Sequence, residues 1–170
     1  MNIYKLSDGS LVKVNILDTA GQEKFKAIND TYYKKADCCL LVYDITDRKS
    51  FEECKEYYCL NIIEKCKKDI KVVLLGNKTD LEEKRQVKSE EGANFALEND
   101  YIFIETSCLR NKNVANAFET LIEIANIEAK KKIENGFHIK LDNHNRKKRQ
   151  DCIFFHLFDE LFKKFMFWKK

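Results

Sequence analysis

The chain has 170 residues, enough for one domain with a covered sheet and too few for a second domain of ordinary size. Its 44% apolar and 35% charged residues exclude a disordered chain and a membrane-spanning one. The net charge of +3 is uneven, because residues 146–170 carry eight Lys/Arg against three Asp/Glu, or +5, which leaves −2 for residues 1–145.

Short apolar runs predict five strands. Residues 2–6 and 11–17 flank a turn at residues 7–10 and are typical of a hairpin. Three later runs are β-branched or aromatic and short enough for strands buried on both faces, at residues 38–43, 71–75 and 101–104. Cys38 and Cys39 lie in one of these runs, so we expect small buried thiols in a reducing compartment. The seven cysteines form no C-x-x-C pair, and we expect neither a disulfide framework nor a zinc site.

Between the strands, apolar residues three and four apart predict helices. Ser50 and Ser89 are the expected N-caps of two of them, the second supported by acidic residues in its first turn. The helical stretches are residues 23–34, 50–67, 89–98 and 113–133. Strands that alternate with helices predict an α/β fold of three layers, with a mostly parallel sheet opened by one antiparallel edge hairpin.

The pattern ends near residue 134, so residues 1–134 are expected to form the folded domain. A polar and basic linker follows over residues 135–150. Residues 151–170 are expected to form an amphipathic aromatic tail, because several apolar positions fall on one helical face: 154, 157, 158, 161, 162 and 165.

The segment DTAGQE, residues 18–23, follows a predicted strand. In parallel sheets ligands bind beyond the carboxyl ends of strands. A carboxylate such as Asp18 can hold Mg²⁺ through water, Gly21 lets the backbone approach a phosphate, and Gln22 can orient an attacking water. By itself the segment has a simpler interpretation, in which Asp18 caps the next helix and Gln22 is exposed to solvent.

The segment NKTD, residues 77–80, follows the predicted buried strand at residues 71–75. Guanine offers adjacent N1–H and N2–H₂ donors, so the Asp80 carboxylate can accept both, whereas adenine presents an acceptor there. Asn77 can bond the base and strap the loop, and the aliphatic stem of Lys78 can cover one face of the ring. An ordinary polar turn is the alternative interpretation.

The segment ETSCL, residues 105–109, ends the last predicted strand. A backbone N–H in it can meet the guanine O6 acceptor, although alone it is also typical of a plain strand exit.

Together, these three segments resemble the Ras superfamily of small GTPases. DTAGQEKFKAINDTYYKKADCCLLVYDITDRKSFEE is similar to the Rab branch in particular, and GNKTDL, ETS and NVANAFETLI continue the resemblance over about residues 2–130. The resemblance implies a P-loop NTPase fold and a GTP/GDP-binding, GTP-hydrolysing switch in vesicle-mediated transport, with Mg²⁺ as cofactor. Its implied site has Gln22 as catalytic residue, Asp18 at the metal, and nucleotide contacts from Asp18, Gly21, Asn77, Lys78, Asp80, Ser107, Cys108 and Leu109.

The sequence departs from this family in several respects. No G-x-x-x-x-G-K-[ST] phosphate-binding loop occurs in it, and the first switch, first strand and first helix of the family are missing. We therefore expect a truncated domain with two unpaired inner strand edges, weak nucleotide binding and negligible hydrolysis. An incomplete gene sequence is the explanation we favour. Leu109 and Cys108 replace the family's usual lysine and alanine, which should weaken guanine selection without abolishing it.

The resemblance also implies partners and a location. Effector, exchange-factor and activating proteins would bind through residues 21–34. The chain lacks a C-terminal prenylation signal, so residues 146–170 could instead lie on an anionic membrane surface, carry a nuclear-targeting run, or be translated noncoding sequence. We expect a cytoplasmic protein, peripheral on the cytosolic face of endomembranes, that does not bind nucleic acid. The alternative function is a non-enzymatic pseudo-GTPase or truncated fragment that binds protein or membrane.

Overall fold

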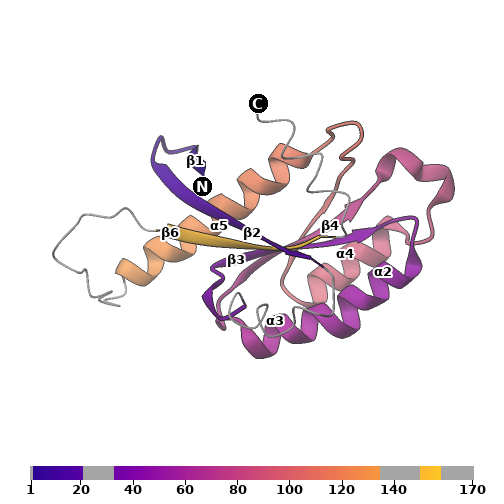
Figure 1. Cartoon of the computed structure of the whole chain (residues 1–170), viewed down its shortest axis with the longest axis horizontal. Helices are drawn as coiled ribbons and strands as arrows, with labels where there is room; N and C mark the ends of the chain where they lie inside the picture. Colours follow the sequence, from indigo (N-terminus) through magenta and orange to yellow (C-terminus); the bar gives the residue numbers. More distant parts are fainter. Residues whose placement is uncertain (1, 21–32, 135–149, 158–170) are drawn as a thin grey trace.

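A twisted sheet runs through the centre of the computed structural model, which describes residues 2–20, 33–134 and 150–157 (Figure 1). Among these residues six strands pair in the order β1-β2-β6-β3-β4-β5, with β1 antiparallel to β2 and the other pairs parallel. The strands are β1 Asn2–Lys5, β2 Leu11–Ala20, β3 Cys38–Asp44, β4 Lys71–Asn77, β5 Ile102–Glu105 and β6 Gln150–Leu157.

Helices cover both faces of this sheet. α5 packs on β3 and β4 from one side, while α2, η2, α3 and α4 lie on the other (Figure 1). The helical segments are α2 Arg48–Glu53, the π-helix η2 Cys54–Tyr58, α3 Cys59–Lys65, the 3₁₀-helix η3 Thr79–Lys84, α4 Ser89–Glu98 and α5 Val114–Glu134. The predicted three-layer α/β fold with an antiparallel edge hairpin is confirmed.

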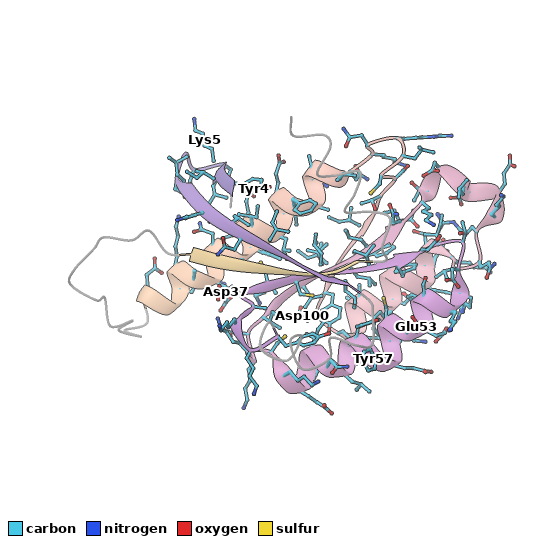
Figure 2. All side chains as sticks on the ribbon, in the orientation of Figure 1. Tyr4, Lys5, Asp37, Glu53, Tyr57 and Asp100 are labelled. Carbon is cyan, nitrogen blue, oxygen red and sulfur yellow. The ribbon has the colours of Figure 1, made fainter. Side chains whose placement is uncertain are left out.

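Strand β3 separates two apolar clusters. Leu40 faces the cluster beneath α5, and Leu41 faces the cluster beneath α2, α3 and α4. Both side chains are at most 1% exposed, and burial of each leucine stabilises the fold by about 1.5–3 kcal/mol. Cys38 and Cys39 are fully buried on opposite sides of the strand, as predicted. Figure 2 shows Tyr4 on the hairpin and Glu53 and Tyr57 on the helical layer of the opposite face.

Three of the four predicted helical stretches, 50–67, 89–98 and 113–133, were located to within a few residues, but both predicted N-caps are wrong. Asp47 caps α2 by accepting the backbone N–H of Lys49 at 3.0 Å. Ser50 lies inside α2, where its Oγ donates to the Asp47 carbonyl at 2.7 Å. Lys88 is the N-cap of α4, and the Glu91 carboxylate accepts its backbone N–H at 3.0 Å. An acidic side chain therefore satisfies the helix start in place of each serine.

Strand β2 is longer than predicted. It was expected to end at residue 17, which placed Asp18 just beyond it, but β2 continues to Ala20. The extension exists because β6 pairs alongside it, with Asp18 opposite Phe155 and Ala20 opposite Leu157.

Residues 150–157 correct the prediction for the tail. The helical face expected within residues 151–170 is not formed by residues 151–157, which lie in the strand β6 between β2 and β3. The expectation of two unpaired inner strand edges is also wrong here, since β6 makes a parallel ladder with both β2 and β3. The physical reason is that two facing strand edges offer backbone partners that a helical tail would leave unused.

Most of the predicted helix 23–34, the linker 135–149 and residues 158–170 lie outside the described residues. None of the helices that the structure describes has the length and apolar character to cross a membrane.

Candidate functional site

The candidate site lies at the carboxyl edge of the sheet, where β3, β4 and β5 end side by side. Because these strands are parallel and in register, Asp44 is paired with Asn77, and Glu105 is paired with Gly76. The turns that follow β4 and β5 are therefore neighbours. The structure brings together the segments 77–80 and 105–109 that the sequence singled out.

Asn77 joins the two turns. It is 3% exposed, and its Oδ1 accepts the Thr106 hydroxyl at 3.1 Å and the Cys108 backbone N–H at 3.3 Å. The backbone adds a second connection, because the Thr106 carbonyl accepts the N–H of Thr79 at 3.1 Å. Asn77 thus straps the loop, as the sequence predicted for one of its two roles.

Asp80 lies opposite Ser107. The Ser107 hydroxyl donates to Asp80 Oδ1 at 2.5 Å, and Ser107 itself is fully buried. Its backbone is fixed by a reciprocal pair with Lys112, at 3.1 and 2.9 Å. A carboxylate has about four acceptor positions, so Asp80 can hold Ser107 and still accept two more donors. The half-exposed Asp80 side chain is oriented before any ligand arrives.

Lys78 adopts a left-handed backbone conformation, with φ of 71°. Its ammonium lies 2.7 Å from Oδ2 of Asp44, whose side chain is 13% exposed. Burial of Asp44 opposes its charge, but hydrogen bonds from Lys78 and Thr46 outweigh this and hold the pKa of Asp44 below its usual value. The ion pair fixes the ammonium of Lys78 beside the end of β3.

Cys108 and Leu109 complete the second turn. The Cys108 N–H, expected to meet a guanine O6, instead donates to Asn77 at 3.3 Å, beyond the usual N–H···O range. A base at this position would have to share or replace that long bond. Leu109, which stands where a lysine was expected, is 66% exposed and offers an apolar surface at the rim.

The predicted phosphate end is described only in part. The backbone of Asp18 lies in β2, separated from β3 by β6. The role of Asp18 at a metal stays a prediction. Gly21 and Gln22 lie outside the described residues.

Two residues of the site were missed in the sequence. Asp44 holds Lys78, and Thr106 supports Asn77 through its hydroxyl and Thr79 through its carbonyl. The signal for Asp44 was present, since it directly follows the predicted strand 38–43 just as Asn77 follows the next strand.

Known proteins resemble this chain over most of its length. The model of the Ras family matches residues 3–127. Ras-related protein Rab-8A of Bos taurus is 44% identical over 129 residues, which cover 76% of this chain and 62% of the relative. Ras-related protein Rab-8A of Gallus gallus is 43% identical over the same length and with the same coverage. Ras-related protein Rab-8B of Homo sapiens is 45% identical over 114 residues, covering 67% of this chain and 55% of the relative.

The chain thus spans less than two thirds of the length of these curated relatives. The family match nevertheless covers most of the chain, and it contains both turns of the site. The chain belongs to the Ras family, as a Rab-like member of these small GTPases.

Proposed function

We propose that the edge formed by the 77–80 and 105–109 turns binds the guanine base of GTP or GDP. Ras-family proteins bind these nucleotides with Mg²⁺ in general. The observation that supports the proposal here is the set of hydrogen bonds joining the turns, from Cys108 and Thr106 to Asn77 and from Ser107 to Asp80. They bring the Asp80 carboxylate, an acceptor for the two donors of guanine, into the same pair of turns as the Cys108 N–H, which would meet O6 by sharing or replacing its bond to Asn77.

The faces of the base would be covered by apolar atoms. The stem of Lys78, held at its end by Asp44, is placed to cover one face, and exposed Leu109 is placed near the rim. Both contacts are indifferent to the identity of the purine. Selection of guanine therefore depends on Asp80.

The phosphate end is proposed from the family alone. Asp18 would hold Mg²⁺, Gly21 would meet the terminal phosphate and Gln22 would position water for hydrolysis. The 170 residues contain no G-x-x-x-x-G-K-[ST] segment. For this chain we therefore expect binding weaker than micromolar and negligible hydrolysis, because the phosphate cradle supplies most of the electrostatic stabilisation.

In the cell, the proposed role is a nucleotide-dependent switch in vesicle-mediated transport. Effector, exchange-factor and activating proteins would bind residues 21–34. Residues 150–157 lie in the sheet, so the proposed membrane contact of residues 146–170 would involve only the segments that flank β6.

Calorimetric titration of the chain with GDP and with ADP, each with Mg²⁺, tests the proposal. We expect GDP to bind at least about tenfold more tightly, since each hydrogen bond to a charged group contributes about 1.5–3 kcal/mol. Asp80→Asn should reduce the affinity for GDP and leave that for ADP unchanged. Equal affinities of the unmodified chain for both nucleotides would remove the basis for a guanine site.

A further inference from the structure

β2 and β3 do not pair with each other, and β6 fills the space between them. Neighbouring strands in a sheet lie about 4.7–4.9 Å apart, so these two edges are separated by about two spacings. The space accommodates one strand and no more. Each edge carries backbone donors and acceptors that need a partner.

The two walls of this space are held by α5 independently of β6. On the hairpin, Ser7 donates its N–H to Glu123 at 3.2 Å, and Asp8 pairs with Lys130 at 2.6 Å. Val12 and Val14 of β2 pack in the same buried cluster as Leu121 of α5. On the other side, α5 packs directly on β3 and β4 (Figure 1). Both walls of the space thus contact α5 in addition to their ladders with β6.

β6, by contrast, is held mainly by its two ladders. Eight of its residues pair with β2 and four with β3. Among the described residues no helix packs on β6 as α5 packs on β3 and β4. Because these contacts are mostly backbone hydrogen bonds to two strand edges, another copy of the same sequence can supply them.

The register defines which sequence fits. Ile153 lies between Ile16 and Cys38, and Phe155 lies between Asp18 and Leu40. On the α5 side the walls are apolar at Val14, Ile16, Cys38 and Leu40. On the other face Phe154 is paired with Cys39, which is also fully buried. An occupant thus needs consecutive apolar residues, as a strand buried on both faces does.

We propose that the space between β2 and β3 is a preformed strand-acceptor site for an extended apolar peptide that enters parallel to β2. Residues 150–157 are its internal, exchangeable occupant. The same sequence supplied as a separate peptide binds there once the internal strand is disabled. This proposal does not depend on nucleotide binding.

The first test uses full-length Ile153→Pro. Proline lacks the N–H that a strand paired on both sides requires, so the substitution expels β6. A fluorescent peptide of residues 148–159 is titrated by anisotropy. We expect saturable binding to I153P, and binding at least about tenfold weaker to the unmodified chain, whose tethered strand competes at high effective concentration. A control peptide with the same proline substitution should bind neither chain.

Three results overturn the proposal. They are a folded I153P chain that does not bind the peptide, equal binding by I153P and the unmodified chain, and equal binding of the control peptide. If I153P does not fold alone, the peptide present during refolding should restore a soluble chain that melts cooperatively. Failure of that rescue also overturns the proposal, because the strand then cannot be supplied from outside.

A second test locks the occupant in place. Asn15 is the register partner of Cys152, so Asn15→Cys should form a disulfide with Cys152 on mild oxidation, identified by mass spectrometry. Lys13→Cys is the matched control, since its partner is Gln150, two residues away. In the double variant N15C/I153P the internal strand is expelled, so the bound peptide should cross-link through its own Cys152 to residue 15 on mild oxidation, whereas K13C/I153P should not cross-link to it. Failure of N15C/I153P to capture the peptide, or equal capture by K13C/I153P, contradicts the proposed site.

Discussion

The hydroxyl of Ser107 donates to Oδ1 of Asp80 at 2.5 Å, across the two turns that follow β4 and β5. Ser107 is fully buried, and Asp80 is half-exposed at the edge. A buried donor thus fixes one oxygen of the carboxylate and leaves acceptor capacity directed outward. Such preorganisation lowers the entropic cost of binding a base.

Ser107→Ala tests this orientation. Loss of the hydroxyl frees Asp80 and also removes the acceptor for the Arg110 N–H, bonded at 3.1 Å. We expect the affinity for GDP to fall by about 3–10-fold, the equivalent of one hydrogen bond of about 0.5–1.5 kcal/mol. Cys108→Ala is the control, because the backbone N–H survives, and titration calorimetry should find its affinity nearly unchanged. A larger loss for Cys108→Ala than for Ser107→Ala would contradict the assigned roles.

Asn77→Ala should destabilise the fold as well as the site. The change leaves the Cys108 N–H and the Thr106 hydroxyl without their acceptor in a buried region, at a cost of about 1–3 kcal/mol. Urea unfolding measures the difference. Thr106→Val removes only the hydroxyl bond and keeps the shape, so it should cost less than Asn77→Ala. The reverse order would show that Asn77 does not strap the two turns.

Tyr43→Phe should leave stability unchanged or raise it by up to about 1–2 kcal/mol. The hydroxyl of Tyr43 is buried and has no hydrogen-bond partner among the described residues, so its removal loses no bond seen there and ends a desolvation cost. Burial also raises the pKa of Tyr43 well above its usual value, so the phenol stays neutral. Tyr101→Phe is the matched control and should destabilise, because that hydroxyl lies 3.3 Å from Cys59 Sγ. Thermal denaturation of both variants measures the two effects. A lower melting temperature for Tyr43→Phe would contradict the absence of a hydrogen-bond partner for this hydroxyl.

Gly92→Ala should destabilise despite the better helix propensity of alanine. A methyl group on this residue of α4 would lie 2.7 Å from Cε2 of Phe103 and would also overlap the Tyr43 hydroxyl. Overpacking costs about 1–3 kcal/mol, against about 1 kcal/mol gained in propensity. Asn94→Ala, exposed on the same helix, should be neutral or stabilising. In a double-mutant cycle Tyr43→Phe should recover about 0.5 kcal/mol or more of the loss, and strict additivity would contradict the contact.

Asp44→Asn should reduce stability in a pH-dependent way. The folded pKa of Asp44 lies below its ordinary value of 3.8, so the charged form stabilises the fold fully above about pH 4. This contribution is lost as the pH falls through the lowered folded pKa. We expect Asp44→Asn to lower the free energy of unfolding by about 1–2 kcal/mol at pH 7 and by progressively less below pH 4. Urea unfolding of both chains at several pH values measures this difference. A difference that stays constant with pH would rule out the ion pair with Lys78 as its source.

Much of the fold could be predicted from the sequence because its signals are local. The strands around Leu40 and Leu74 are uninterrupted apolar runs, and such runs are buried wherever they occur in an α/β sheet. Asn77 and Asp80 could be placed near Ser107 because parallel strands end at one edge. The pairing of Lys78 with Asp44 could not be predicted from the sequence, since it depends on the left-handed turn at Lys78 and on the register of β3 with β4.

β6 could not be predicted for a different reason. Its local pattern favours a helix, with apolar positions three and four apart, but the neighbouring edges of β2 and β3 determine its conformation. Those edges lie more than a hundred residues away in the chain. Tertiary context overrides local preference in such a strand.

The most direct measurement of guanine recognition separates the base from the phosphates. Titrations of the ¹⁵N-labelled chain with GMP, IMP and AMP should shift the backbone amides of residues 77–80 and 107–109. We predict that GMP binds most tightly, that IMP binds more weakly because it lacks the 2-amino donor to Asp80, and that AMP leaves these amides unchanged. Shifts confined to other parts of the chain, or equal affinities for GMP and AMP, would contradict a guanine site at this edge.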